Sequence, residues 1–148
     1  MRTDMVSNIN QKVPKVGAGA VIIKDDKVLL SKRKGSHGDG MWGSTGGHLE
    51  FGESPFETAK REALEELGIE IGNIEFATCM NLIMEGKHYI DISFTAEIIS
   101  GEPINQEPEK IEEIGWFPLD SLPTPLFEPV KVVIESIKSG KKYFEIKR

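Results

Sequence analysis

Cysteine and long apolar runs are scarce in this sequence of 148 residues. Cys79 is the only cysteine, so an internal disulfide cannot form and nothing indicates an oxidising compartment. The longest wholly apolar run, from Gly17 to Ile23, is far shorter than the ~20 residues of a membrane span. The polar stretch from Met1 to Lys15 has no apolar segment of the kind that marks a secretory signal. We therefore expect a cytoplasmic protein with no membrane partner.

Positive charge is also in deficit. The sequence has 18 Lys and Arg against 24 Asp and Glu, a formal net charge of -6, and its isoelectric point is near 5.2. Nucleic-acid backbones are bound largely through basic residues that neutralise phosphates, so we expect a small-molecule partner and no nucleic acid. The short basic run Lys32, Arg33 and Lys34 either contacts substrate phosphates or is a solvated strand end.

The rest of the composition is that of an ordinary globular protein, with 39% hydrophobic and 28% charged residues. We expect a single domain over residues 1–148 with a core at roughly 16–139. Apolar patterns and turn residues predict strands at 18–23, 27–31, 75–84, 88–99 and 110–118, and helices at 54–67 and 128–139. The glycines from Gly35 to Gly47 favour a loop whose backbone comes close to another group. This order predicts an α+β fold in which helices cover a sheet.

The first predicted helix has clear start and stop signals. Ser54 and Glu57 form a capping box, with Pro55 at the first helical position. Gly68 ends the helix. Apolar residues at three- and four-residue spacing predict one buried stripe, which comprises Phe56, Ala59, Ala63 and Leu67 in this helix and Val130, Val133, Ile134 and Ile137 in the second.

The same helix carries a dense group of carboxylates. Five glutamates lie within the 14 residues from Glu53 to Glu66. At ~100° per residue, Glu62 lies within ~40° of Glu66 and ~60° of Glu65, so these three share one face. Like charges four apart destabilise a helix by roughly 0.2 to 0.5 kcal/mol per pair, and a hard cation such as Mg²⁺ would offset this repulsion. Taken alone, a glutamate-rich helix is more often simply a solvated face.

The full spacing favours the metal site over the solvated face. Gly47 is followed after five residues by Glu53, after seven more by Arg61-Glu62, and then by Ala63, Glu65-Glu66 and Gly68-Ile69. This 23-residue pattern resembles the Nudix box of the Nudix hydrolases, with every defining position filled. Weaker similarity extends over roughly residues 16–137, and it includes Trp42, and Glu109 and Glu112 ahead of Trp116-Phe117-Pro118.

The resemblance implies an α/β/α sandwich with a mixed central sheet, in which the box helix holds catalytic Mg²⁺ or, in its place, Mn²⁺. By position, Glu62 and Glu66 would be the principal metal ligands, and Glu65 a further ligand or the general base. The carbonyl of Gly47 would also bind the metal. Arg61 would pair with Glu53 and orient the helix. The implied reaction is attack of water on phosphorus in a nucleoside diphosphate linked to a further group.

Several segments look most like the nucleoside triphosphate diphosphatases of that family, which release a nucleoside monophosphate and pyrophosphate. They are residues 46–53, the Glu107-Pro108-Glu109-Lys110 segment, Leu122-Pro123 and Leu126-Phe127. The alternatives are a hydrolase of ADP-ribose, nucleotide sugars or another nucleoside diphosphate derivative, and a non-catalytic nucleotide-binding module. The binding module would have eroded box carboxylates, and none is eroded here.

Residues outside the box complete the expected site. We expect substrate contacts from Gly46, His48, Arg33 and Phe127. Phe127 stacks on the base or packs in the core, whereas core packing is favoured for Trp116 over a place beside the cleft. Glu112 or Glu113 would supply an extra ligand or base, because the family often draws one from outside the box.

One position departs from the family pattern. Many relatives have a proline immediately before the paired glycines, where this chain has Thr45. We expect a looser loop there, which affects the Gly47 carbonyl and leaves the carboxylates unchanged. Homodimerisation is frequent among similar proteins, and we expect it here as well.

Overall fold

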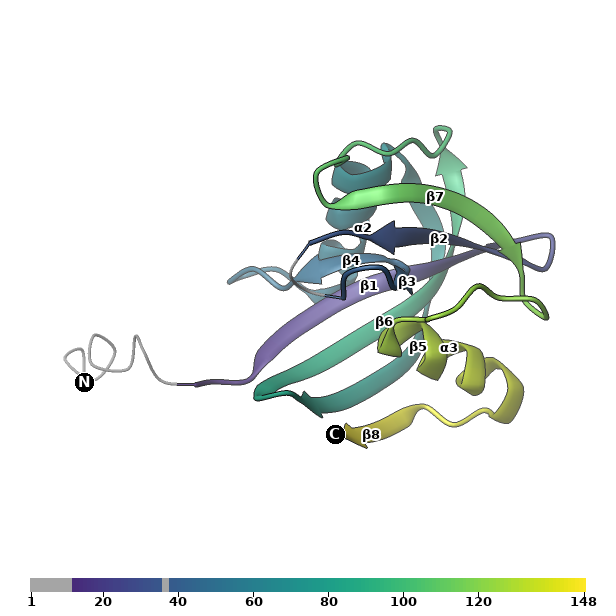
Figure 1. The fold of residues 1–148 in the computed structure, drawn as a ribbon. Helices are drawn as coiled ribbons and strands as arrows, with labels where there is room; N and C mark the ends of the chain where they lie inside the picture. Colours follow the sequence, from purple (N-terminus) through teal and green to yellow (C-terminus); the bar gives the residue numbers. More distant parts are fainter. Residues whose placement is uncertain (1–11, 36–37) are drawn as a thin grey trace.

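The computed structural model describes residues 12–35 and 38–148. A mixed sheet forms the middle layer, with helix α2 over one face and helix α3 over the other (Figure 1). The α/β/α layering expected from the sequence is therefore confirmed. In chain order the elements are β1 (Lys15–Lys24), β2 (Lys27–Arg33), β3 (Trp42–Gly43), β4 (Thr45–His48), α2 (Pro55–Leu67), β5 (Glu70–Met84), β6 (Lys87–Ser100), β7 (Ile111–Pro118), α3 (Glu128–Ser139) and β8 (Tyr143–Lys147).

Strand β1 is the centre of the sheet. Its neighbours follow the order β3-β2-β1-β6-β5-β8, while β4 also pairs with β1 and β7 with β2. The β1–β6 pair is parallel, and the β1–β2 and β1–β4 pairs are antiparallel. Successive side chains of a strand point to opposite faces. Ile22 accordingly packs in the cluster that contains α2 residues, and Val21 in the cluster that contains α3 residues. Burial on both faces explains the continuous apolar run in β1.

The strands predicted at 18–23 and 27–31 form a hairpin, and both predicted helices are confirmed. Asp25 and Asp26 have φ of 52° and 62° between β1 and β2, the left-handed conformations of a two-residue hairpin turn. Helix α2 has Ser54 as its N-cap within a complete capping box, and Gly68 at its C-cap has φ of 69°. The prediction of a buried position is wrong for two members of the apolar stripes, because Phe56 is 44% exposed and Ile137 is 50% exposed.

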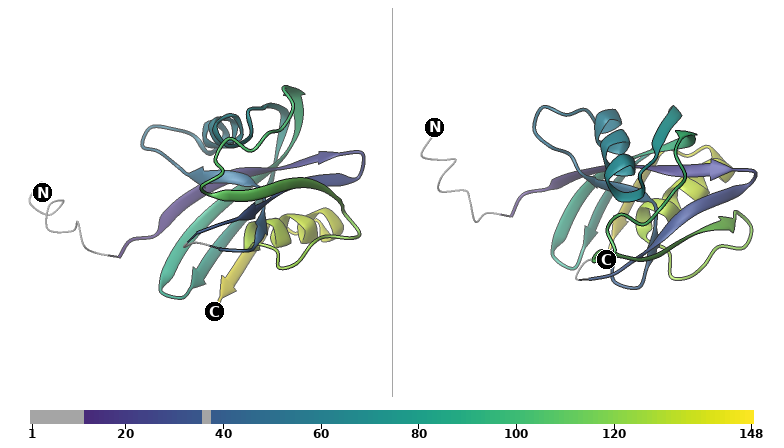
Figure 2. Two further views of the ribbon diagram at one scale, coloured as in Figure 1. Left: turned by 45° about the horizontal axis from the view of Figure 1, so that its top comes forward. Right: turned by 90° about the horizontal axis from the view of Figure 1, so that it is seen from above.

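The glycine-rich stretch is only partly a loop, and this corrects the sequence-based prediction. Residues 42–43 and 45–48 form the short strands β3 and β4. Glycine permits this pairing, because a Cβ on Gly19 would lie 2.3 Å from the carbonyl oxygen of Thr45, and one on Gly46 would lie 2.9 Å from that of Ala18. Because neither glycine has a Cβ atom, β1 and β4 can approach closely. This approach brings the end of β4 against helix α2 (Figure 2).

The far edge of the sheet also differs from the prediction. Strand β8 was not predicted, lies beyond the expected core limit at residue 139, and pairs in parallel with β5. Its Phe144 is 6% exposed and joins a third apolar cluster with Met80. Strand β5 begins at Glu70 and not at residue 75, with Asn73 in a left-handed conformation where the pairing register shifts. Among the described residues, no helix is long and apolar enough to cross a membrane.

Candidate active site

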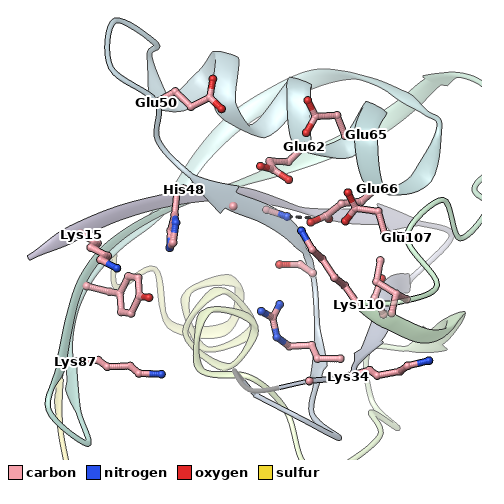
Figure 3. Close-up of a pocket in the computed structure, with 18 of the residues that line it drawn as sticks. Lys15, Lys34, His48, Glu50, Glu62, Glu65, Glu66, Lys87, Glu107 and Lys110 are labelled. Carbon is pink, nitrogen blue, oxygen red and sulfur yellow. Dashed lines mark hydrogen bonds between the residues drawn. The ribbon is translucent and has the colours of Figure 1, made fainter.

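An open cleft of about 1160 Å³ lies between helix α2, strand β4, the segment before β7 and the β5–β6 turn. Its two sides carry opposite charge (Figure 3). Glutamates line the side of α2, and lysines stand across from them on other elements of the fold. The glutamates are Glu50, Glu62, Glu65 and Glu66 with Glu107 and Glu109 from the segment before β7, and the lysines across the cleft are Lys15, Lys34 and Lys87.

Glu66 is held against strand β4. Its Oε1 accepts a hydrogen bond of 2.6 Å from the Thr45 hydroxyl and one of 3.3 Å from the backbone N–H of Gly46. Burial raises the pKa of Glu66 to about 8, with the nearby charges of Glu62 and Glu107 acting in the same direction and the two hydrogen bonds opposing them. This carboxylate is therefore poorly solvated, with Glu62 and Glu107 as negative neighbours and Arg33 as a positive one. A bound cation would stabilise its ionised form further.

Glu62 lies directly against the backbone of Gly47. A Cβ on Gly47 would stand only 2.2 Å from Glu62 Oε2, so a larger residue there would displace the carboxylate. The Glu62 side chain is 14% exposed and accepts a hydrogen bond of 3.0 Å from Arg61 Nη1. Burial raises its pKa, and Arg61 opposes that rise. The first residue of the Nudix-like pattern thus meets the helical part of the pattern at this contact.

Arg61 joins the box helix to the turn that precedes it. Its Nε donates to Glu53 Oε2 at 2.7 Å and its Nη2 to Glu53 Oε1 at 3.0 Å, which is a bidentate pair. Nη2 also donates to the His48 carbonyl oxygen at 3.2 Å, and Nη1 to Glu65 Oε1 at 3.2 Å. The hydrogen bonds from Arg61 lower the pKa of Glu53 to about 2, with help from Thr58. Arg61 therefore fixes the position of α2 relative to β4.

The carboxylates of the cleft are suited to a hard cation, but they do not by themselves form a complete coordination sphere. Across residues 12–35 and 38–148, no three His, Cys, Asp or Glu side chains stand close enough together to hold a metal ion unaided. Glu65 is half exposed and pairs with Arg61. Mg²⁺ typically uses only one or two carboxylates and completes its shell with water and substrate phosphates. Glu62 and Glu66, two neighbouring carboxylates with raised pKa values, fit such a site.

The structure places the two carboxylates expected from outside the box, Glu112 and Glu113, away from the cleft lining. Glu112 is 53% exposed and lies 3.9 Å from Lys32, and Glu113 is exposed beside the same lysine in the β2–β7 ladder. The structure therefore does not bring Glu112 or Glu113 into the cleft. Glu107 and the exposed Glu109 line the cleft in their place, and Glu107 is the one whose charge acts on Glu66. The segment before β7 brings them there by folding over the C-terminal end of α2, where the Gln106 side chain donates to backbone carbonyls at 2.9 and 3.0 Å.

A smaller pocket of about 120 Å³ adjoins the cleft and shares the β4 glycines with it. All four residues expected to contact substrate line this pocket, namely Gly46, His48, Arg33 and Phe127. The Arg33 guanidinium lies 4.4 Å from the ring centroid of Phe127. The His48 ring is stacked on the Tyr89 ring, and the two ring centroids are 5.9 Å apart. Trp116 packs beside the apolar cluster under α2 and is not part of the cleft lining, as core packing predicts.

Several residues of the site were not predicted individually, among them Lys15 and Lys87 across the cleft. Glu107 and Lys110 lie in a segment that had been noted only as a whole, and both line the cleft. Asp91 lines the smaller pocket from the middle of β6. The available signal was an acidic residue between two isoleucines of a predicted strand, since a buried carboxylate costs stability unless it has a function or a partner.

Comparison with known proteins agrees with this geometry. The sequence model of the NUDIX domain matches residues 13–136. An NAD-capped RNA hydrolase from Pseudomonas aeruginosa is 37% identical over 103 residues, covering 70% of this chain and 36% of that protein. An oxidized purine nucleoside triphosphate hydrolase from Danio rerio is 30% identical over 109 residues, covering 70% and 65%. The chain thus spans between about a third and two thirds of the length of these relatives.

The solved structures include similar folds. The crystal structure of a MutT NUDIX hydrolase from Burkholderia pseudomallei superposes with a TM-score of 0.81 at 35% sequence identity. The match covers 85% of this chain and 99% of that one. The arrangement of sheet and helices is therefore shared over nearly the whole length of that protein.

Proposed function

Because the chain belongs to the NUDIX family, we propose that its cleft hydrolyses nucleoside triphosphates to a nucleoside monophosphate and pyrophosphate. Members of this family generally use divalent metal ions. The observation that carries the proposal is the juxtaposition of Glu62 and Glu66 with lysines across a single cleft. A polyphosphate is the substrate that such a cleft suits, since its negative charge needs both the lysines and a cation held by the carboxylates.

In the proposed mechanism the residues of α2 and β4 have separate tasks. Glu62, Glu66 and the Gly47 carbonyl would hold Mg²⁺, which when bound neutralises phosphate charge and lowers the pKa of a coordinated water. Arg61 positions Glu62 and Glu65 through its hydrogen bonds and anchors the helix through Glu53. These contacts fix the geometry before substrate arrives, which is the main way a protein accelerates phosphoryl transfer.

A carboxylate at the cleft must accept the proton of the attacking water. Glu65 is the candidate from the box, and Glu107 is the candidate from outside it, because both line the cleft beside Glu66. Arg61 Nη1 donates a hydrogen bond of 3.2 Å to Glu65 Oε1, so the protein itself already occupies one oxygen of Glu65. We therefore assign proton acceptance to Glu107, and Glu65 would add its second oxygen to the metal site as a further ligand. A larger fall in kcat for Glu107→Gln than for Glu65→Gln at saturating Mg²⁺ would support this division.

A second candidate substrate is NAD-capped RNA, which is named for the Pseudomonas aeruginosa relative. The lysines across the cleft favour it, because they offer positive charge to a phosphate backbone despite the negative net charge of the chain. The expectation that excludes nucleic acid therefore stays a prediction. Binding of Mg²⁺ in particular and assembly into a homodimer are likewise proposals.

The test is a panel assay with Mg²⁺ in which every product is resolved. The panel comprises the nucleoside triphosphates, ADP-ribose, a nucleotide sugar and an RNA with a 5′ NAD cap. The proposal predicts monophosphate and pyrophosphate from the triphosphates, loss of this activity in Glu66→Gln, and parental activity in Glu75→Gln, a control at an exposed position of β5. Turnover confined to ADP-ribose, the sugar or the capped RNA would overturn the assignment of substrate. Turnover unaffected by Glu66→Gln would overturn the assignment of the metal site.

A further inference from the structure

The smaller pocket contains one carboxylate that the proposed hydrolysis does not use. Asp91 and Ser93 lie two residues apart on β6, so their side chains are on the same face of the strand and both line the pocket. The Ser93 hydroxyl donates a hydrogen bond of 2.8 Å to Asp91 Oδ2. In the described part of the chain no Lys, Arg or His forms an ion pair with Asp91. The carboxylate thus has acceptor capacity that the protein itself leaves unfilled.

Glycine keeps the second oxygen of Asp91 open to the pocket. A Cβ on Gly17 would lie 3.4 Å from Oδ1 and 3.6 Å from the carbonyl oxygen of Gly47. A larger side chain at Gly17 would therefore fill the space between Asp91 and the glycines of β4. The present arrangement leaves that space to a ligand.

The other walls suit a flat ring system. Met80, Leu82 and Phe127 supply apolar surface, and the stacked pair of His48 and Tyr89 borders both the small pocket and the cleft. A volume of about 120 Å³ is well below the ~300 Å³ or more of pockets that enclose a whole drug-sized ligand. One ring system therefore enters here, while the charged remainder of the ligand extends past Gly46 and Gly47 into the cleft.

The chemistry of the carboxylate selects among bases. An ionised carboxylate only accepts hydrogen bonds and can accept two parallel ones from adjacent N–H groups. The guanine ring offers such a pair in its ring N1–H and exocyclic 2-amino group. Adenine and cytosine offer one amino group beside an acceptor nitrogen, and uracil and thymine offer one N–H between two carbonyls. These four edges each place an acceptor against the carboxylate, which is unfavourable in a buried site.

We propose that Asp91 is a specificity-determining residue, which accepts hydrogen bonds from the adjacent N–H groups of a guanine-type base seated in the small pocket. The inference rests on the proposed hydrolysis of nucleoside triphosphates, and it names the substrate class as guanine nucleotides. Ser93 holds Oδ2 and so sets the plane in which Asp91 meets the base. Burial raises the pKa of Asp91 to about 6, so the accepting form predominates at neutral pH.

Equilibrium binding of monophosphates tests the inference without requiring turnover. Titration calorimetry at pH 7.5 would compare guanosine, inosine and adenosine monophosphates, since inosine lacks only the 2-amino group. The parent should bind the guanosine compound at least about tenfold more tightly than the other two, because a site built around N–H donors discriminates against analogues that lack them. Asp91→Asn should remove this preference, and Asp120→Asn, an exposed control on another segment, should keep it.

Two further results separate the inference from the proposed function. Ser93→Ala retains the Asp91 carboxylate, so it should weaken guanosine monophosphate binding less than Asp91→Asn does and keep the order of the three ligands. Equal affinities in the parent, or a guanine preference that survives Asp91→Asn, would overturn the inference even if triphosphates are hydrolysed. A preference that Asp91→Asn abolishes, in a protein that hydrolyses no triphosphate, would uphold the base pocket and overturn the proposed reaction.

Discussion

The Thr45 hydroxyl donates a hydrogen bond of 2.6 Å to Oε1 of Glu66. Thr45 occupies the position where many relatives have proline, and a looser loop was expected from that difference. In the structure Thr45 is 3% exposed and is paired with Ala20 in the β1–β4 ladder. A strand and a side-chain hydrogen bond therefore hold this segment, and the same bond fixes a carboxylate of the proposed metal site.

Thr45→Val tests this contact, because valine keeps the shape of the side chain and removes its donor. The hydroxyl lowers the pKa of Glu66, so its loss should raise that pKa further and weaken metal binding near neutral pH. We expect kcat/KM to fall by about tenfold at limiting Mg²⁺ and by less at saturating Mg²⁺. Steady-state kinetics over a range of Mg²⁺ concentrations measures both. An equal loss at every concentration would show that Thr45 does not act through the metal site.

Thr78→Val is the matched control for Thr45→Val, and it also tests a separate prediction about stability. Within the described chain, Thr78 Oγ1 is buried without a hydrogen-bond partner. Replacing an unpaired buried hydroxyl with a methyl group removes a desolvation cost, so the free energy of unfolding should rise by about 1 kcal/mol. Chemical denaturation measures this change. Catalysis should not change, because Thr78 does not line the cleft. A lower stability would mean that the hydroxyl has a partner after all.

Arg61→Lys keeps the charge and removes the planar fork. Lysine cannot make the bidentate pair with Glu53 and at the same time reach Glu62 and Glu65. We expect a lower melting temperature and a fall in kcat/KM of about 10²-fold through misplacement of the carboxylates. Arg148→Lys, on the Arg148–Glu128 pair at the start of α3, is the control, and it should leave kcat/KM unchanged. Parental activity in Arg61→Lys would show that the guanidinium of Arg61 is not needed to position the carboxylates.

The raised pKa of Glu66 predicts how the stability of the metal-free protein varies with pH. The folded state keeps a proton on Glu66 up to a pKa of about 8, whereas the unfolded chain loses it near 4.5. The folded state therefore binds more protons between these two values, and this group makes stability fall as pH rises across that window. Thermal unfolding in EDTA from pH 5 to pH 8 should show a steeper decline for the parent than for Glu66→Gln. Parallel curves would contradict the assignment, and Mg²⁺ should flatten the curve of the parent.

Local signals in the sequence were enough to predict much of this fold. The capping box at Ser54 and the stop at Gly68 depend on contacts within a few residues, and they are confirmed. The apolar stripes of both helices are confirmed apart from Phe56 and Ile137. Strands β4 and β8 were missed because their pairing is with residues distant in the chain. In β4 the close approach to β1 at Gly19 decides the structure, and no local propensity reports it.

The site likewise contains some contacts that local sequence predicts and others that depend on residues distant in the chain. The contacts of Arg61 and Glu62 lie within the contiguous box, so their spacing could be reasoned out before the fold was known. Glu107 reaches the cleft because its segment folds back over α2, and Asp91 does so because β6 pairs with β1. The choice between Glu107 and Glu112 depends on strand exposure and register, which the sequence does not encode locally.

The most direct test of the account is ³¹P NMR of a nucleoside triphosphate incubated with the protein and Mg²⁺. The account predicts that resonances of monophosphate and pyrophosphate appear together, that EDTA prevents their appearance, and that Glu66→Gln slows it by several orders of magnitude while Glu75→Gln does not. Release of inorganic phosphate and a nucleoside diphosphate, or an equal rate in Glu66→Gln, would contradict it.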